Sequence, residues 1–207
     1  FPMKNKTLKI CMAGFGNVGQ NFARLVQAKQ RQIARMTGHE IVFSGISTRS
    51  RGTLANPRGL DLDEVFAMIK KRGRFDPERP DYLSGDALAM MTKSKAHLFC
   101  ELTPLSIRDG QPAARYIESA FHHGMDVISA NKGPEAWHYQ RLKELADKKG
   151  RRFLFETIVM DGTPVFNLVR HTLPGVRINR IRGILNSTSN FVLTCMEQGM
   201  EYDQALK

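Results

Sequence analysis

The sequence has no long apolar run and few cysteines, and each shortage excludes a class of protein. No segment approaches the roughly 18 consecutive apolar residues that a membrane-spanning helix needs. Cys11, Cys100 and Cys195 lie far apart within apolar runs. This spacing argues against a disulfide framework or a metal site and favours free thiols in a reducing compartment. We therefore expect a cytoplasmic protein that has no membrane contact.

Acidic residues are also scarce, with 20 Asp and Glu against 31 Lys and Arg, which gives a net charge of +11. Such a balance raises the question of a nucleic-acid partner. The basic residues are scattered, however, and no nucleic-acid-binding motif or aromatic-interleaved basic stretch is present. We expect no nucleic-acid partner. A polyanionic cofactor or a solvated surface accounts for the charge.

The hydrophobic pattern predicts an α/β protein. Short apolar runs that are typical of buried strands occur at 8–13, 41–47, 96–100, 125–130 and 153–155. They alternate with helical patterns at 20–36, 62–71, 112–123 and 134–149, and the rest of 49–95 has no clear period. This alternation indicates a Rossmann-type, doubly wound parallel sheet. We interpret Phe1 and Pro2 as a tag remnant and assign residues 3–155 to this first domain.

The pattern changes after Glu156, where we expect an incomplete second domain of α+β type over 156–207. A helix is predicted to end near Leu173, and residues 176–185 alternate apolar and basic side chains, as in a strand with one buried face. Ser189 or Asn190 is the predicted N-cap of a following helix. An unfinished sheet exposes apolar surface, so we expect self-association through this domain.

A glycine-rich turn follows the first predicted strand and opens the first predicted helix. In this context the GxGxxG spacing predicts dinucleotide binding. The first glycine permits a tight turn, the second lets a diphosphate approach the backbone, and the third lets the helix pack on the strand. The helix N-terminus then faces the phosphates. The candidate cofactor-binding residues of this turn are Gly14, Phe15, Gly16, Asn17, Val18 and Gly19.

The end of the second predicted strand has no carboxylate for the adenosine ribose of NAD. It has Arg49 and Arg51 among hydroxyl side chains instead, which suit a 2′-phosphate. We therefore favour NADP over NAD, with Arg49 as the main phosphate ligand and Arg51 as support. The alternative is that both arginines are solvated loop residues.

Two further candidates follow later predicted strands. Thr103 and Pro104 end a strand at the same sheet edge, where they either contact the cofactor or simply terminate the strand. Lys132 follows the strand at 125–130 in a predicted tight turn with Gly133 and Pro134. A lysine held there is a candidate cofactor ligand and a candidate catalytic residue that binds the substrate oxygen or moves a proton.

Five ordered motifs resemble those of homoserine dehydrogenases: the glycine turn, Glu101-x-Thr-Pro, Ala130-Asn-Lys-Gly-Pro, Glu156-x-x-Val-x-x-Gly-x-Pro and Gly183-Ile-Leu-Asn-x-Thr-Ser-Asn. The resemblance covers nearly the whole chain. It implies a two-domain dimer in which the second domain is catalytic and forms the dimer interface. It also implies NADP-linked or NAD-linked interconversion of L-homoserine and L-aspartate 4-semialdehyde, in the branch leading to threonine and methionine. Lys132 matches one of the family's two functional lysines.

The same resemblance implies a site for a monovalent cation such as sodium, bound largely through backbone carbonyls. The matching positions are Glu156, Val159, Asp161 and Thr163. The alternative for Glu156 and Asp161 is an N-terminal cap of the next helix. The chain departs from the family pattern at Ser187, where a glycine is usual. The family's second functional lysine falls after Lys207.

Two other functions stay open on the sequence. A truncated or diverged relative would bind NADP without catalysis. Another NADP-linked semialdehyde or imine reductase would share the architecture. A semialdehyde dehydrogenase that acts through a nucleophilic cysteine is disfavoured, because no cysteine lies in a polar turn that would activate it.

Overall fold

The computed structural model describes residues 6–207, and it divides the chain into two compact units. The first unit ends at Phe155 and the second is Glu156–Lys207. Phe1 and Pro2, interpreted above as a tag remnant, lie outside the described residues. None of the described helices is long and apolar enough to span a membrane.

A seven-stranded sheet with the order β4-β3-β2-β1-β5-β6-β7 forms the centre of the first unit. Strands β2, β1, β5, β6 and β7 are parallel, and β3 and β4 extend the β2 edge in antiparallel pairs. The predicted Rossmann-type sheet is confirmed. The strands are β1 Lys6–Ala13, β2 His39–Thr48, β3 Gly52–Ala55, β4 Tyr82–Leu83, β5 Leu98–Glu101, β6 Asp126–Ser129 and β7 Phe153–Leu154.

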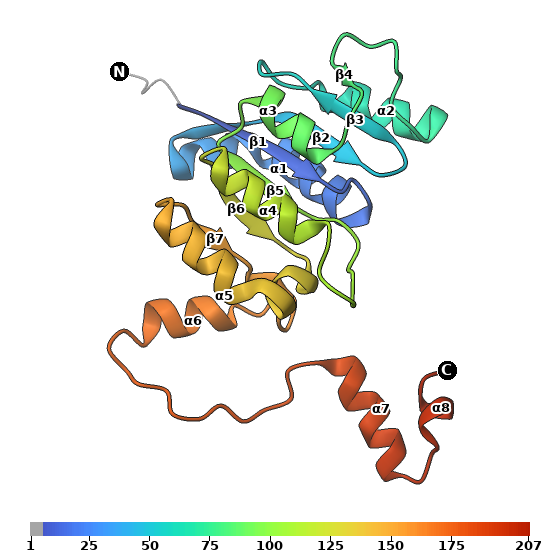
Figure 1. Ribbon diagram of the computed structural model, residues 1–207, viewed down its shortest axis with the longest axis vertical. Helices are drawn as coiled ribbons and strands as arrows, with labels where there is room; N and C mark the ends of the chain where they lie inside the picture. The colour runs from blue at the N-terminus through green and yellow to red at the C-terminus, as the bar shows by residue number, and fades with distance from the viewer. Residues whose placement is uncertain (1–5) are drawn as a thin grey trace. The chain divides into compact units, whose positions relative to one another are not determined.

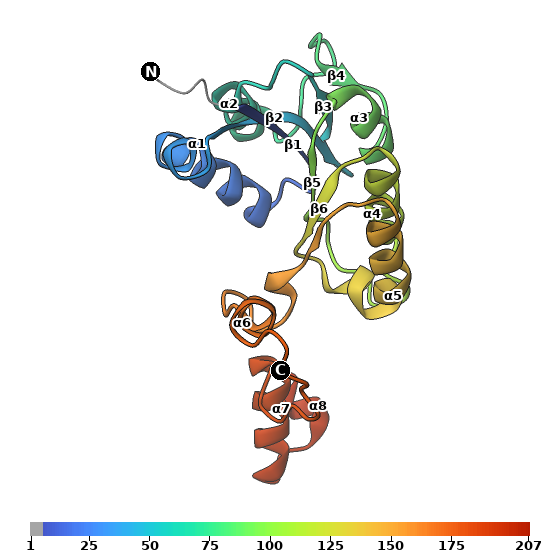
Figure 2. The ribbon, with the colours of Figure 1, turned by 90° about the vertical axis from the view of Figure 1, so that its left-hand side faces the viewer.

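Helices cover both faces of this sheet. In Figure 2, α1 and α2 lie on one face and α3, α4 and α5 on the other, as expected for a doubly wound fold. Fully buried Phe15 and Phe75 pack in the first layer, and Ile117 and Phe121 of α4 are buried in the second. The helices are α1 Asn17–Thr37, α2 Leu62–Arg72, α3 Ala87–Ser94, α4 Ala113–His122 and α5 Lys132–Lys148.

The sequence pattern does not identify β3, β4 and α3, which lie in the stretch with no clear period. The two strands are four and two residues long. Strands this short have too few positions to display a period of two, and their pairing is decided by the β2 edge. Helix α3 has eight residues and is buried at four of them, so no polar face reveals its period.

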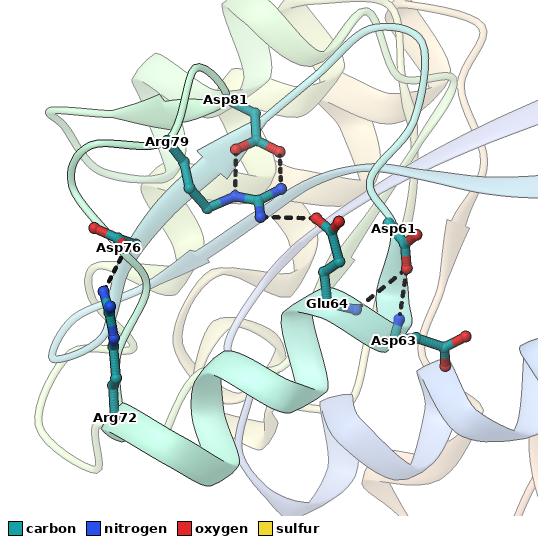
Figure 3. Close-up of polar contacts among 7 residues, drawn as sticks. All are labelled: Asp61, Asp63, Glu64, Arg72, Asp76, Arg79 and Asp81. Carbon is teal, nitrogen blue, oxygen red and sulfur yellow. Dashed lines mark hydrogen bonds and ion pairs between the residues drawn. The ribbon is translucent and has the colours of Figure 1, made fainter.

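A network of charged side chains fixes the loop before β4 to α2 (Figure 3). The Arg79 guanidinium donates from Nε and Nη2 to the two oxygens of Asp81, at 2.7 and 2.9 Å, and from Nη1 to Glu64 Oε2 at 2.8 Å. The hydrogen bonds that Arg79 donates to Asp81 hold the pKa of Asp81 below its ordinary value. Asp61 caps α2 by accepting from the backbone N–H groups of Asp63 and Glu64.

All of the regular secondary structure in the second unit is helical (Figure 1). It contains the 3-10 helix η1 Glu156–Ile158, α6 Val165–Thr172, α7 Ser187–Glu197 and α8 Tyr202–Ala205. The predicted strand at 176–185 is wrong: these residues form neither strand nor helix. A strand needs a partner for its backbone N–H and C=O groups, and no described segment pairs with this one.

Helix α7 begins earlier than predicted. Its N-cap is Asn186, whose Oδ1 accepts from the Ser189 backbone N–H at 2.8 Å. The prediction of Ser189 or Asn190 as the cap is therefore wrong, because the extended backbone of Asn186 already presents a capping side chain. Ser187 is the first residue of this helix and has no positive φ, so the serine that replaces the family's glycine is unstrained.

Candidate functional site

A cleft of about 830 Å³ opens where β1, β2 and β5 end. Its walls are the glycine turn after β1, the turn between β2 and β3, the start of α3, and the loop between β5 and α4. Strand β1 is central in the sheet, and its two neighbours belong to different halves of the strand order. This is the topological switch point at which open α/β sheets bind ligands.

The three glycines of the turn have different surroundings. Gly14 has φ +96°, and a Cβ there would lie 2.3 Å from the Leu102 carbonyl oxygen. A Cβ on Gly19 would lie 2.6 Å from the Gly14 carbonyl oxygen, so this glycine lets α1 pack close to the turn. A Cβ on Gly16 would have no heavy atom within 4 Å. Gly14 and Gly19 are thus needed for packing, whereas Gly16 faces open space in the cleft wall.

The N-terminus of α1 meets the cleft at Gly16, its N-cap residue. No side chain caps the helix there, and its first turn has no acidic residue. The first backbone N–H groups of a 21-residue helix therefore remain available to an anion, whose charge the helix dipole also favours.

Arginine side chains also line the cleft, in the turn between β2 and β3. Arg51 donates from Nη1 to the Phe15 carbonyl oxygen at 2.9 Å, and Gln20 donates to the same oxygen at 3.1 Å. Arg51 thus anchors the glycine turn to the sheet. Arg49 is exposed and lines the cleft. Together with Arg108 from the loop after β5, these side chains give the cleft a positive charge.

A buried polar network supports the wall formed by the loop after β5. Glu101, at the end of β5, is fully buried and accepts from both the backbone N–H (3.0 Å) and the hydroxyl of Thr103. Asn131 donates from Nδ2 to the Thr103 carbonyl oxygen at 3.1 Å and accepts from the Gly133 N–H at 3.0 Å. Glu101, Thr103 and Asn131 therefore connect the cleft wall with the first turn of α5.

Burial raises the pKa of Glu101 to about 7, although hydrogen bonds from Thr103 and Asn131 oppose the shift. Glu135, in the first turn of α5, is also buried, and its pKa is raised to about 7 for the same main reason. The charge of Glu101 adds to the shift at Glu135.

Side chains of α5 hold the rest of the loop. Trp137 donates from Nε1 to the Ile107 carbonyl oxygen at 3.2 Å, and the Nε2 of His138 donates to the Asp109 carbonyl oxygen at 2.8 Å. Gly110 approaches α5 so closely that a Cβ would lie 2.7 Å from the Gly133 carbonyl oxygen. The cleft wall and the start of α5 consequently form one packed assembly.

The structure brings most predicted cofactor residues together and leaves others aside. The predicted residues that line the cleft are Gly14, Phe15, Gly16, Arg49, Arg51, Thr103 and Pro104. Asn17, Val18 and Gly19 lie in α1 outside the lining, and Lys132 is also outside it. The prediction that Lys132 lies in a tight turn is wrong. It is the exposed first residue of α5, because the Asn131 cap starts the helix before Pro134.

In the predicted cation segment, Glu156 acts as a helix cap. Its carboxylate accepts from the backbone N–H groups of Phe166 and Asn167 at 2.8 and 3.2 Å. Asp161 has a positive φ of 48°, and the Thr163 N–H donates to the Met160 carbonyl oxygen at 3.0 Å. Across residues 6–207, no group of three or more His, Cys, Asp or Glu side chains is arranged to hold a metal. A cation here would rely on backbone carbonyls.

Sequence reasoning missed part of this site. Glu101 carries a recognisable signal, because it is a single carboxylate at the end of an apolar strand. Glu135 carries none, since a glutamate in the first turn of a helix is ordinarily exposed. The cleft residues Asp86 and Arg108 lie in irregular segments and gave no pattern either.

A glycine turn joining a central parallel strand to a long helix, beside a basic hairpin turn, defines a dinucleotide-binding protein of the Rossmann class. Residues 14–156 match the family described as homoserine dehydrogenase, NAD binding domain, and residues 164–207 match homoserine dehydrogenase. The chain belongs to the homoserine dehydrogenase family.

Individual relatives agree with this assignment. The chain is 32% identical to the homoserine dehydrogenase of Sulfurisphaera tokodaii over 97% of its length and 58% of the relative's. It is also 32% identical to the NAD(+)-dependent homoserine dehydrogenase of Pseudomonas canavaninivorans, over 96% of this chain and 56% of that protein. A hyperthermophilic archaeal homoserine dehydrogenase in complex with NADPH superposes with a TM-score of 0.77 at 28% identity, covering 97% and 59% of the two chains. The chain thus spans less than two thirds of the length of these proteins.

Proposed function

We propose that this chain is the cofactor-binding part of an enzyme that interconverts L-homoserine and L-aspartate 4-semialdehyde, in the branch leading to threonine and methionine. The observation that carries the proposal is the cleft at the switch point of the sheet, with Gly16 open to it and family-matching sequence around it. When bound, a nicotinamide cofactor supplies or accepts the hydride.

Different residues of the chain would bind different parts of the cofactor. The uncapped N-terminus of α1 and the backbone at Gly16 would hold the diphosphate. Arg49 would bind the 2′-phosphate of NADP, while Arg51 positions the glycine turn through the Phe15 carbonyl. Thr103 and Pro104 would border the nicotinamide end. We therefore propose NADP as the cofactor. NAD is the alternative, because one relative is named an NAD(+)-dependent homoserine dehydrogenase.

Lys132 is our proposed catalytic residue on this chain. An ammonium group at the exposed start of α5 has no carboxylate partner among the described residues, so it is available to the substrate oxygen. In the proposed role it donates a hydrogen bond to the hydroxyl or carbonyl oxygen and stabilises charge that develops there. In a protein spanning the full length of the relatives, Lys132→Ala should lower homoserine-dependent cofactor reduction on the order of 100-fold. Lys148→Ala, in the last turn of the same helix, is the matched control.

Three further expectations belong to this proposal. A monovalent cation such as sodium would bind at backbone carbonyls in 156–163, and sodium should then raise the thermal stability of the second unit more than tetramethylammonium does. Homo-oligomerisation through 156–207 is supported by exposed Ile181, Ile184 and Phe191. A cytoplasmic location is supported by the buried free thiols of Cys11 and Cys100.

The cofactor assignment can be tested on this chain by fluorescence titration with NADPH and NADH. Arg49→Ala should weaken NADPH binding by roughly 10- to 100-fold, because a charge-assisted hydrogen bond is lost. It should leave NADH binding nearly unchanged. Arg58→Ala removes an exposed arginine outside the cleft and is the control. Equal losses for both cofactors would contradict a 2′-phosphate role for Arg49.

A further inference from the structure

The cleft is basic, but one acidic side chain also lines it. Asp86 carries the only carboxylate among the described residues of the lining. The basic side chains there are those of Arg49, Arg51 and Arg108. A polyanionic ligand accounts for the arginines. A carboxylate in the same wall would repel that ligand, unless it faces a part of the ligand that is neutral and donates a hydrogen bond. Asp86 therefore marks the place of such a part.

Asp86 is held firmly and can still accept a further hydrogen bond. It is the N-cap residue of α3, and its Oδ1 accepts from the Leu88 backbone N–H at 2.9 Å. The residue before it, Gly85, accepts at its carbonyl oxygen from the Thr53 hydroxyl at 2.7 Å. The Asp86 side chain is exposed, and no ion pair between described residues includes it. A carboxylate has about four lone-pair positions, so Asp86 can cap the helix and also bind a ligand.

The start of α3 lies on the side of the cleft that carries the proposed 2′-phosphate site. Thr53, which holds Gly85, belongs to β3, and its hydroxyl lies 2.9 Å from that of Ser47 in β2. The turn between these two strands presents Arg49, the proposed ligand of the 2′-phosphate. The loop after β5, which we propose borders the nicotinamide, is separated from β3 by β2 and β1 in the sheet. Asp86 is thus placed at the adenosine end of the cleft.

The surface beside Asp86 suits a flat aromatic base. Helices α3 and α4 pack together on one face of the sheet (Figure 2). Both begin at the cleft, where Ala87, Pro112 and the half-buried Tyr116 line the wall. Burial raises the pKa of Tyr116 and the charge of Asp86 adds to the shift, so the phenol stays protonated. An aromatic side chain and small apolar groups are the surfaces on which bases stack.

We propose that Asp86 selects the base of the cofactor: its carboxylate accepts a hydrogen bond from the 6-amino group of adenine, which lies against the first turns of α3 and α4. The inference deepens the proposed function and rests on it, because it concerns the same cleft. Adenine is attached to the ribose that carries the 2′-phosphate, so a phosphate at Arg49 brings the base to this end. Hypoxanthine has an oxygen in place of the amino group and would set an acceptor against the carboxylate.

The test is displacement of bound NADPH by oxidised dinucleotides, followed through the fluorescence of NADPH. In the wild-type chain, nicotinamide hypoxanthine dinucleotide phosphate should bind roughly 10- to 30-fold more weakly than NADP. In Asp86→Asn this ratio should fall to about threefold or less, because an amide offers an acceptor to adenine and a donor to hypoxanthine. Asparagine caps a helix as well as aspartate does, so α3 is preserved. Asp61→Asn is the matched control and should keep the wild-type ratio, because Asp61 is also an exposed N-cap but lies outside the cleft.

A second ligand separates the two ends of the cofactor. The 3-acetylpyridine analogue of NADP lacks the N–H groups of the nicotinamide amide and keeps adenine, so its affinity relative to NADP should be the same in wild type and Asp86→Asn. A change in that ratio would place Asp86 at the nicotinamide and overturn the inference. A hypoxanthine ratio near one in wild type, or one that Asp86→Asn leaves unchanged, would also overturn it while the cleft remains the cofactor site. Failure of wild type to bind NADPH would instead contradict the proposed function, and the inference with it.

Discussion

The two units of this chain have similar fractions of apolar residues but bury them very differently. The first unit packs a sheet between two helical layers, and most of its large apolar side chains are buried or partly buried. In the second unit, Val192 and Ala205 are the buried hydrophobic residues among 156–207. The exposed apolar residues there include Ile178, Ile181 and Phe191, which are 40%, 71% and 63% exposed.

The contrast shows which parts of the chain can pair their backbone hydrogen-bonding groups and bury their apolar side chains. Each strand of the first unit has a neighbour, so its hydrogen bonds and its apolar faces are completed together. The segment 176–185 has the alternation of a strand but no partner, and it remains irregular. Folding stability should therefore reside in the first unit, and variants in matched positions of the two units can test this.

The largest difference is expected for buried against exposed phenylalanine. Phe99 in β5 is fully buried, so Phe99→Ala should lower the free energy of unfolding by about 4 kcal/mol. Phe191→Ala on α7 should change it by less than about 0.5 kcal/mol. Urea denaturation measures both. A comparable loss for Phe191 would mean that the second unit is buried by self-association, and the loss should then depend on protein concentration.

The next difference concerns two glycines. Gly14→Ala introduces a Cβ 2.3 Å from the Leu102 carbonyl oxygen at a positive φ, and should cost about 3 kcal/mol. It should also abolish NADPH binding, because the turn must shift. Gly162→Ala has no heavy atom within 4 Å of the new Cβ and should cost less than about 0.5 kcal/mol. Thermal unfolding followed by circular dichroism would compare them, and a stable Gly14→Ala would contradict the close approach of the turn to the Leu102 backbone.

A pH effect is expected from the buried carboxyls of the first unit. Their pKa values are about 7 in the folded protein against an ordinary 4.5, so the folded state binds more protons between these values. Stability should fall as the pH rises from about 4.5 to about 7 and then level off, by at most roughly 3 kcal/mol per carboxyl. Glu101→Gln should reduce this slope in urea denaturation at a series of pH values. A slope as steep as that of the wild type would exclude Glu101 as its source.

The smallest difference is expected at two helix caps. Asp61→Ala removes two hydrogen bonds to the first turn of α2 and should cost about 1 kcal/mol of global stability. Asn186→Ala removes the cap of α7 and should accelerate amide exchange in that helix, with less than about 0.3 kcal/mol of change in global unfolding. Equal global effects would show that α7 unfolds together with the sheet.

Much of the fold was predictable because it repeats a strong local pattern. The long α1, the parallel strands and the glycine turn follow from apolar periodicity and from spacing, which are local properties. The edge strands β3 and β4 were not predictable, because strands this short depend on the edge they join. The strand expected at 176–185 failed for the same reason, since alternation specifies a face and cannot supply a partner.

The site divides in the same way. The sequence alone determined the glycine turn, the basic turn at Arg49 and the family, because these depend on residue type and spacing along the chain. Only the tertiary structure decided that Arg51 anchors Phe15, that Lys132 starts a helix outside the cleft, and that Glu101 and Glu135 are both buried. Burial and electrostatic contact between residues distant in sequence arise when strands and helices pack, and no local pattern encodes them.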